Sequence, residues 1–260
     1  MPVRRAAGQS EKLFAKGVEM SAEIVYNRIL VIFMVQKTFG VALDGPSGSG
    51  KSTLARLVAQ RYGFVYVDTG SLYRAVGYYI AQKGIDPRDN AAVCAALPGI
   101  KLDMRLENGG SAVYLDGVRL GTEIRTPEIS AYASAVSAIP QVREFLLSVQ
   151  RGIAERQDVV MDGRDIGTVI LPDARVKIFI TASPEERAAR RFRELSDRGE
   201  NVVYEDILAR MKERDFNDRN RDIAPTVPAK DAVIIDNTGM SAQQTLEAVA
   251  DIIDKERARK

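Results

Sequence analysis

The sequence contains no histidine, and it has only one cysteine among its 260 residues. Without histidine there are no imidazole general bases, no Ser-His-Asp triads and no histidine metal ligands. The lone cysteine, Cys94, excludes an internal disulfide framework, and we expect it to be a buried, small apolar residue. Any chemistry must therefore use carboxylates, cations, hydroxyls and backbone groups.

Long apolar runs and a strong net charge are missing as well. The longest candidate, ILVIFMV at 29–35, is far shorter than the roughly 18 residues of a membrane span. The net charge of +2 gives no general attraction to nucleic acid or to membranes. The hydrophobic content of 45% is ordinary for a soluble globular protein. We therefore expect a cytoplasmic monomer that has no nucleic-acid partner and no membrane partner.

Residues 1–37 form an N-terminal extension to which the sequence assigns no role. Their acidic residues Glu11, Glu19 and Glu23 argue against an acid-poor transit peptide. No small-residue cleavage site follows the apolar run, so a secretory signal is not indicated either.

From residue 38 onward, short apolar runs alternate with helical segments. The first helical segment carries Leu54, Leu57 and Val58 on one face and is expected to stop near Gly63. Such an alternation predicts an α/β fold in which helices cover both faces of a five-stranded parallel sheet. The five predicted strands span residues 39–44, 64–68, 159–162, 176–180 and 232–236.

The middle of the chain departs from this alternation. Asp116-Gly117 separates two short alternating runs and is typical of a tight hairpin turn, which needs positive φ. We therefore expect a small antiparallel β insertion over about residues 100–121. Helices resume with Thr126-Pro127-Glu128, a cap residue followed by proline at the first helical position.

Two later helices begin with cap signals. Ser183-Pro184-Glu185-Glu186 has the pattern of a capping box and opens an Arg-rich helix. Ser241 with Gln244 is predicted to cap the final helix.

Residues 45–52, GPSGSGKS, match the phosphate-loop pattern G-x-x-x-x-G-K-[ST] between a predicted strand and a predicted helix. The glycines let successive backbone N–H groups face inward as an anion nest, and the following helix adds its positive end. Lys51 supplies a cation for the β- and γ-phosphates, and the Ser52 hydroxyl is expected to ligate Mg²⁺. The alternative is a glycine-rich turn whose lysine is incidental. The expected ATP contacts of this P-loop NTPase core are Gly45, Pro46, Ser47, Gly48, Ser49, Gly50, Lys51, Ser52 and Thr53.

The P-loop alone does not identify the activity. A transporter ATPase would need a second signature of the LSGGQ type, a GTPase would need an N-K-x-D motif, and the sequence contains neither. A nucleotide-gated protein that binds nucleic acid through an Arg-rich helix is a non-enzymatic alternative, and its binding would depend steeply on salt. The remaining hypothesis is a kinase for a small acceptor.

A kinase with a phosphorylated acceptor must hold two dianionic groups close together, which requires several cations around them. Arginine suits this task because its planar fork binds phosphate bidentately. Arginines occur where predicted strands end, in DTGSLYR with Arg74 and in VMDGRD with Arg164, and again in residues 211–225 after the Arg-rich helix. An isolated arginine is usually a surface residue, but these three stretches agree in order and placement.

These segments together resemble the bacterial-type cytidylate (CMP/dCMP) kinases, a branch of the P-loop nucleoside monophosphate kinases. The resemblance runs from about Phe39 to Asp254, and DGRDIGT and the final Arg-rich motif are specific to this branch. It is carried by DGPSGSGKST, DTGSLYR, EIRTPEIS, SAIPQVRE, DGRDIGTVILPDA, SPEERAARR and KERDFNDRNR. In this sequence Thr69 stands where many members have serine, and Phe216-Asn217 interrupts a motif that is often more charged.

The resemblance implies ATP-dependent phosphorylation of CMP and dCMP with Mg²⁺, and it implies roles for individual residues. Contacts to the CMP phosphate are implied for Thr69, Arg74, Arg164 and Arg221. Readers of the cytosine would be Ser134, Arg143 and Asp165, and neighbours of the ribose would be Arg214 and Asp218. Contacts to ATP phosphates are implied for the lid residues Arg187 and Arg191, with Arg190 beside them, unless these form a solvated helix face. The catalytic set would be Lys51, Arg164, Arg214 and Arg221.

A division of the chain follows from the same resemblance. Core segments are expected at 38–99, 131–183 and 214–260, a monophosphate-binding insertion at 100–130, and a short helical lid at 184–213.

The chemistry of cytosine fits these implied roles. Asp165 can accept a hydrogen bond from the exocyclic amine, while Arg143 and Ser134 can donate to O2 and N3. Uracil has a carbonyl in place of the amine and would leave a buried acceptor unpaired, at a cost of about 1–3 kcal/mol. For the activity, the alternative is a kinase of other base preference, such as UMP/CMP. For Asp165, the alternative is a purely structural role, in which it caps a helix or pairs with Arg164.

No protein general base is required, because the acceptor is already an anionic phosphate oxygen. Asp162, at the end of VVMD, is expected to orient Mg²⁺ through water.

Residues 211–225, MKERDFNDRNRDIAP, contain four basic and four acidic side chains. If the stretch is helical, Asp215, Arg219 and Asp222 share one stripe and are expected to pair with one another in solvent. The neighbouring stripe, expected to face the acceptor, comprises Arg214, Asp218 and Arg221.

Overall fold

The strand that leads into the P-loop lies in the centre of the sheet because its side chains are apolar on both faces. In β1 (Gly40–Asp44), Val41 and Leu43 pack into one hydrophobic cluster and Ala42 packs into another. This is the pattern of a buried parallel strand. The protein is described here from a computed structural model that covers residues 38–107 and 110–259, so the N-terminal extension lies outside the described residues.

The sheet contains the five predicted parallel strands, in the order β2-β6-β1-β7-β8. Their carboxyl ends therefore meet at one edge of the sheet, where the P-loop begins. The observed bounds agree with the predicted bounds to within a residue. These strands are β1, β2 (Val65–Asp68), β6 (Val159–Asp162), β7 (Val176–Thr181) and β8 (Val233–Asp236).

The predicted antiparallel insertion is present, and it extends the same sheet. β4 (Gly110–Leu115) pairs antiparallel with β3 (Leu102–Glu107) and with β5 (Val118–Arg119). β4 also pairs in parallel with β2, so the eight strands form one mixed sheet. The turn residues Asp116 and Gly117 have φ of 51° and 81°, as the hairpin prediction requires.

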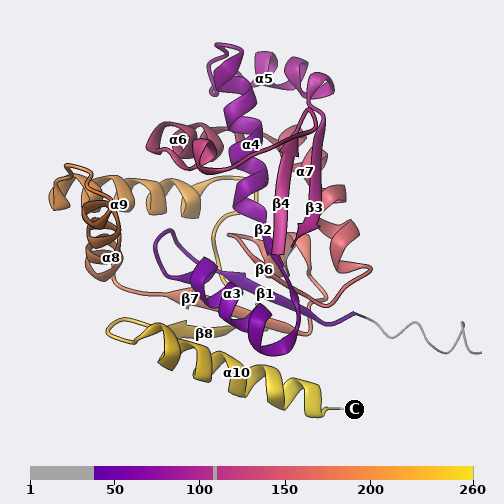
Figure 1. The fold of residues 1–260 in the computed structure, drawn as a ribbon, viewed down its shortest axis with the longest axis vertical. Helices are drawn as coiled ribbons and strands as arrows, with labels where there is room; N and C mark the ends of the chain where they lie inside the picture. The colour runs from indigo at the N-terminus through magenta and orange to yellow at the C-terminus, as the bar shows by residue number, and fades with distance from the viewer. Residues whose placement is uncertain (1–37, 108–109, 260) are drawn as a thin grey trace, which may run out of the picture. The chain divides into compact units, whose positions relative to one another are not determined.

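Helices cover both faces of the sheet (Figure 1). α3 and α10 pack on the face of Val41 and Leu43, and α7 packs on the face of Ala42. α4, α5, α6 and α7 form a further cluster with β3 and β4. The helices are α3 (Lys51–Tyr62), α4 (Thr69–Gln82), α5 (Asn90–Ala96), α6 (Pro127–Val136), α7 (Pro140–Ala154), α8 (Pro184–Asp197), α9 (Tyr204–Asn220) and α10 (Ala242–Ala258), with short turns η1 (Leu97–Gly99), η2 (Thr122–Arg125) and η3 (Ile166–Ile170). Within the described ranges, no helix is both long enough and apolar enough to cross a membrane.

The cap predictions are confirmed for the last helix and only half confirmed for α8. Ser241 and Gln244 form a complete capping box. Ser183 accepts a hydrogen bond from the Glu186 N–H at 3.1 Å. The second bond of a capping box, from the Ser183 N–H to the Glu186 carboxylate, was predicted and is wrong. The Ser183 N–H donates to Thr238 Oγ1 at 3.0 Å instead, because the Glu186 carboxylate binds Arg190.

Two further expectations are corrected. Cys94 is only half-buried, at the margin of the cluster around α4, because α5 presents Val93 rather than Cys94 to the core. α9 ends before Arg221, so the helical spacing expected for residues 211–225 does not extend to Arg221 and Asp222.

Candidate active site

The P-loop lies between β1 and α3, as the sequence predicts. At Gly45, with φ of 142°, an added Cβ would lie 2.0 Å from the Ile180 carbonyl oxygen, so no side chain fits there. Lys51 Nζ donates to the Pro46 carbonyl at 2.6 Å and to Ser49 Oγ at 3.2 Å, which folds the lysine over its own loop. Burial, together with the positive charge of Arg164, lowers the pKa of Lys51. An anion at this place would stabilise the charged lysine.

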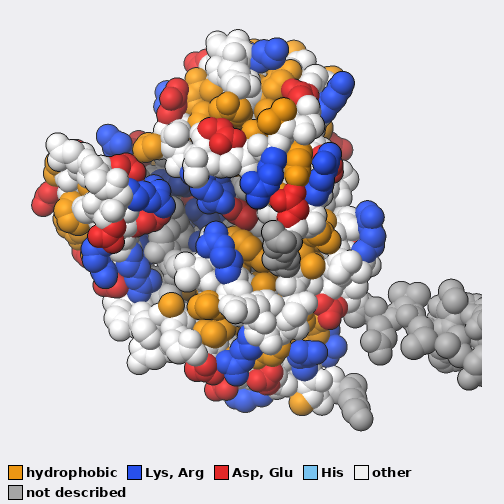
Figure 2. Space-filling model, viewed as in Figure 1, with side chains coloured by type: hydrophobic (Ala, Val, Ile, Leu, Met, Phe, Trp, Pro, Cys, Tyr) orange, Lys and Arg blue, Asp and Glu red, His pale blue; other side chains and the backbone are white. Residues whose placement is uncertain are grey.

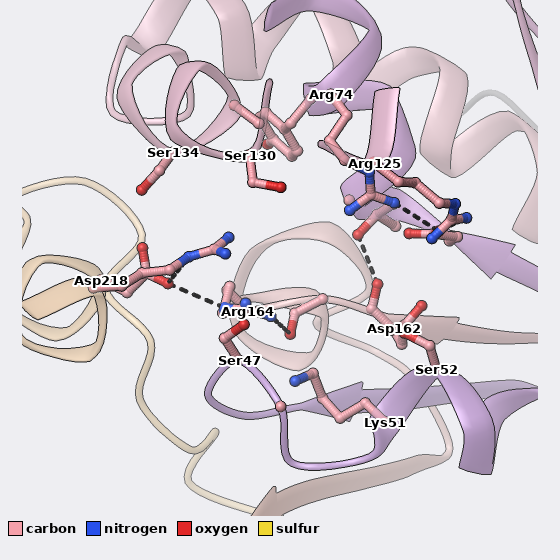
Figure 3. A pocket seen from close by; sticks show the side chains of 18 of the residues that line it. Ser47, Lys51, Ser52, Arg74, Arg125, Ser130, Ser134, Asp162, Arg164 and Asp218 are labelled. Atoms are coloured by element: carbon pink, nitrogen blue, oxygen red, sulfur yellow. Dashed lines mark hydrogen bonds and ion pairs between the residues drawn. The ribbon is translucent and has the colours of Figure 1, made fainter. Parts of the chain in front are cut away.

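A cavity of about 620 Å³ opens beside the P-loop. Figure 2 shows Lys and Arg side chains gathered around the hollow between α8–α9 and the other elements. In Figure 3, Lys51 and Ser52 lie at one end of the cavity and Ser134 lies at the other. The predicted P-loop residues that line it are Ser47, Gly48, Gly50, Lys51, Ser52 and Thr53, whereas Gly45, Pro46 and Ser49 do not.

Asp162 lies at the P-loop end of the cavity, at the carboxyl end of β6. Its Oδ2 accepts a hydrogen bond from Ser52 Oγ at 2.7 Å, and its Oδ1 accepts one from Tyr66 Oη at 2.9 Å. Burial and the nearby charge of Asp68 raise the pKa of Asp162, and the donors from Ser52 and Tyr66 oppose that rise.

A hydroxyl and a carboxylate this close suit a hard cation such as Mg²⁺, which takes oxygen ligands. The described part of the chain contains no cluster of three or more acidic, cysteine or histidine side chains that could hold a metal by themselves. The residues therefore fit a cation whose other ligands come from nucleotide phosphates and water.

A cluster of arginines occupies the middle of the cavity. Arg164 Nε lies 3.2 Å from Asp218 Oδ2, and Arg214 Nε lies 3.8 Å from the same oxygen. Burial and the charge of Arg164 lower the pKa of Arg214 to about 10. Burial alone would raise the pKa of Asp218, but Arg164, Arg214 and Arg221 lower it. Two guanidinium groups thus lie next to one carboxylate and Arg221 adds its charge, so the remaining positive charge favours an anion at this place.

Arg74 reaches the cavity from α4, where Asp68 holds it. Asp68 caps α4 by accepting from the Ser71 N–H at 3.0 Å. Its Oδ2 binds Arg74 Nη2 at 2.8 Å and Arg125 Nη2 at 3.1 Å. Burial favours a higher pKa for Asp68, but the two arginines lower it. The hydroxyl of Thr69, the next residue, donates to the Asp162 carbonyl at 2.7 Å and so ties α4 to β6.

The end of the cavity farther from the P-loop brings together the three predicted cytosine readers, Ser134, Arg143 and Asp165. Arg143 forms an ion pair with Asp165 and donates to the Ser137 carbonyl at 3.1 Å. Asp165 is thus the partner of Arg143 and not of Arg164. Arg221 also belongs to this end, because its Nη1 lies 3.3 Å from Ser137 Oγ.

The lid arginines differ in where they point. Arg191 and its neighbour Arg190 line the cavity, but Arg187 does not. Arg187 is 3% exposed, donates to the Ser47 carbonyl at 2.9 Å and pairs with Asp215 at 2.6 Å. Its place is thus behind the P-loop, where it holds the loop backbone.

The expected pairing within the stripe of Asp215, Arg219 and Asp222 is wrong. Asp215 binds buried Arg187 of α8, whereas Arg219 and Asp222 are exposed. Arg221 and Asp222 follow the end of α9, so helical spacing does not place them. The other stripe does line the cavity, and Arg221, beyond the end of the helix, donates to the Ala224 carbonyl at 2.6 Å and to Ser137 Oγ at 3.3 Å.

Several functional neighbours were missed by sequence reasoning. Asp68 and Arg125 lie in the quoted segments DTGSLYR and EIRTPEIS, so their positions next to predicted site residues could have indicated them. Tyr66 could have been found only from its alternation with Asp68 along β2. No sequence signal marks Asn237, whose Nδ2 donates to the Ser49 carbonyl at 3.0 Å and whose Oδ1 accepts from Arg190 at 3.2 Å.

Comparison with known proteins agrees with this geometry. The family described as cytidylate kinase matches residues 41–255. The cytidylate kinase of Fervidobacterium nodosum is 47% identical over 84% of this chain and 97% of that protein. That of Caldicellulosiruptor bescii is 44% identical over the same shares, and that of Lactiplantibacillus plantarum is 40% identical over 86% and 99%.

Solved structures add little. A shikimate kinase from Acinetobacter baumannii is 15% identical, with a TM-score of 0.43 over 84% of this chain and 94% of that chain. That likeness is too weak to support an argument, whereas the identity to the curated relatives is high and spans nearly their full length. The chain belongs to the cytidylate kinase family.

Proposed function

We propose that this protein transfers the γ-phosphoryl group of ATP to CMP and dCMP, giving CDP and dCDP. One observation carries the proposal: a single cavity has a P-loop at one end, the Arg143–Asp165 pair at the other, and buried arginines between them. Two phosphorylated nucleotides bound at the two ends would place their phosphates among those arginines.

On the donor side, we assign the β- and γ-phosphates to the P-loop backbone and to Lys51. Lys51 already lies over the loop, through its bond to the Pro46 carbonyl. Arg191 lines the same space from α8. Arg187 supports the donor site indirectly, because it binds the carbonyl of Ser47 and so leaves the loop's N–H groups free to face the phosphates.

On the acceptor side, we assign the CMP phosphate to Arg74, Arg164 and Arg221, with Thr69 at the entry to α4. The acceptor oxygen is anionic, so the chain needs to supply position and positive charge rather than a base. Arg214 and Asp218 lie beside Arg164 and are assigned to the ribose.

We further propose that Mg²⁺ is held by Ser52 directly and by Asp162 through water. Bound there, the ion would neutralise charge on the donor phosphates. The residues support this assignment because Ser52 Oγ and Asp162 Oδ2 are 2.7 Å apart at the start of α3.

Base choice is assigned to the pair of Arg143 and Asp165. Asp165 is 3% exposed, so an unsuited base would leave polar groups unpaired away from water. The exocyclic amine of cytosine can donate to this carboxylate, and the carbonyl of uracil cannot. CMP is therefore favoured over a mixed UMP/CMP preference.

The proposal is tested by ADP formation from Mg·ATP with CMP, dCMP, UMP, AMP and GMP in parallel. We expect turnover with CMP and dCMP, and at most weak turnover with the others. Absence of CMP-dependent turnover would contradict the proposal, and equal turnover of UMP would leave only the broader assignment as a pyrimidine monophosphate kinase.

A further inference from the structure

Tyr66 is a buried tyrosine whose hydroxyl contacts the proposed metal site. It is 7% exposed and lies on β2, beside β6, with its backbone opposite Val160. Its hydroxyl donates to Oδ1 of Asp162 at 2.9 Å, and Asp162 is itself 6% exposed. The buried Tyr66 hydroxyl therefore contacts the carboxylate that is proposed to orient Mg²⁺.

The two oxygens of Asp162 are held from two directions. Tyr66 of β2 donates to Oδ1, and Ser52 of α3 donates to Oδ2 at 2.7 Å. The terminal torsion of an aspartate is broad, so the backbone alone does not fix the plane of its carboxylate. A donor on Oδ1 is what keeps Oδ2 directed at Ser52.

The ring of Tyr66 is fixed by its surroundings. It belongs to the hydrophobic cluster between the sheet and α3, and the Arg56 guanidinium lies 5.5 Å from the ring centroid. A ring held on both sides brings its hydroxyl to one place. The hydroxyl can therefore act as a rigid support rather than as a mobile donor.

We propose that Tyr66 is a positioning residue for the metal site: its hydroxyl fixes the Asp162 carboxylate so that Oδ2 faces Ser52 and the water on Mg²⁺. The inference rests on the proposed metal role of Ser52 and Asp162. Partners that orient a metal-binding group commonly account for 10–100-fold in metal affinity. We therefore expect the Tyr66 hydroxyl to contribute about tenfold.

The test compares two tyrosines that make the same kind of bond. Tyr62 Oη donates to Asp254 Oδ1 at 2.9 Å, the same length as the Tyr66 bond to Asp162, but Asp254 does not line the cavity, whereas Asp162 does. Tyr66→Phe and Tyr62→Phe thus remove the same atom and a hydrogen bond to a carboxylate, and Tyr62→Phe also removes a bond to the Ala250 carbonyl at 3.2 Å. Mn²⁺ binding to the protein–ADP complex is followed by the relaxation enhancement of water protons, which needs no turnover.

Tyr66→Phe is expected to weaken Mn²⁺ binding about tenfold, while Tyr62→Phe leaves it unchanged. Unchanged binding in Tyr66→Phe overturns the inference and leaves the proposed function standing. If the unsubstituted protein forms no Mn²⁺ complex with ADP, the metal assignment fails and the inference fails with it.

A double-mutant cycle separates positioning from a loss of folding. In an Asp162→Asn background, Tyr66→Phe is expected to cause no further loss of Mn²⁺ affinity, because the tyrosine acts through the carboxylate. Additive losses from the two substitutions would overturn the inference. The KM of Tyr66→Phe for CMP is expected to stay within about twofold of that of the unsubstituted protein, because the substitution changes none of the residues assigned to CMP.

Discussion

At the scale of single residues, the cavity combines burial with an excess of positive charge. Lys51 and Arg214 both have lowered pKa values, because burial and Arg164 disfavour their charged forms. Binding of an anion at this site is electrostatically favourable, because the anion offsets the repulsion among the cations. The sign of the charge, more than any single contact, supports the proposal that phosphate binds in the middle of the cavity.

Arg221 and Arg219 give a direct residue-scale comparison, because they are close in sequence and differ in position. Arg221 lines the cavity and Arg219 is exposed outside it. We expect Arg221→Ala to lower kcat/KM for CMP about 100-fold, or about 2.7 kcal/mol, as the loss of a charge-stabilising donor does. Arg219→Ala should stay within about twofold. Steady-state kinetics at varied CMP provide the measurement, and similar losses in both variants would refute the assignment.

Asp44 provides a pH-dependent prediction. It is buried at the end of β1 and accepts from the N–H groups of Ile166 at 2.7 Å and Gly167 at 2.8 Å, and burial raises its pKa from 3.8 to about 6. Between these values the folded chain holds a proton that the unfolded chain has lost, so this contribution to stability falls as pH rises. It is complete below about pH 4 and lost above about pH 6, with a span of about 3 kcal/mol.

The measurement is the free energy of unfolding of the unsubstituted protein and of Asp44→Asn between pH 4 and pH 7. As the pH rises across this window, the free energy of unfolding of Asp44→Asn should increase relative to that of the unsubstituted protein. A constant difference would show that Asp44 does not titrate there.

At the scale of elements, the Arg187–Asp215 ion pair joins α8 to α9, and a hydrogen bond from Arg187 joins α8 to the P-loop. Arg187 of α8 binds the Ser47 carbonyl and Asp215 of α9, and Gly48 packs under Met211 and Arg187. An added Cβ at Gly48 would lie 3.1 Å from Met211 Cε, so the glycine lets the helices approach the loop. The expected lid is thus in contact with the donor site through its base.

Asp215→Asn should therefore affect both stability and ATP binding. It leaves Arg187 buried without its charge partner, which typically costs about 3–5 kcal/mol. Lys212 and Glu185 join the same two helices at 2.9 Å but are both about half exposed, so Lys212→Ala should cost less than about 1 kcal/mol. Denaturant unfolding measures both costs, and the KM for ATP should rise in Asp215→Asn alone. Equal costs for the two variants would show that the buried pair has no special role.

At the scale of the whole molecule, the sequence predicted the local features of the fold better than the contacts between distant segments. The five core strands and the P-loop were found because apolar runs, glycine positions and strand–helix order are local properties of the sequence. The partner of Asp215 was mispredicted because it lies on another helix, and helical spacing reports only neighbours on the same helix. Asn237 was missed for the same reason, since its contacts with Ser49 and Arg190 join distant segments.

The pairing of β4 with β2 could not be predicted from the sequence pattern either. The hairpin around Asp116-Gly117 could be predicted from its turn residues. Its attachment to the core sheet depends on a single parallel bridge between Tyr66 and Gly110, which no local signal marks.

The central claim is that one cavity reads cytosine at one end and receives phosphate at the other. It is tested most directly by the ratio of kcat/KM for CMP to that for UMP, in the unsubstituted protein and in Asp165→Ala. The ratio is taken within one preparation, so a change in the folded fraction cancels. We predict that the unsubstituted protein favours CMP by at least about tenfold, within the range set by about 1–3 kcal/mol, and that Asp165→Ala reduces this preference toward unity. The same ratio in both proteins would contradict the account.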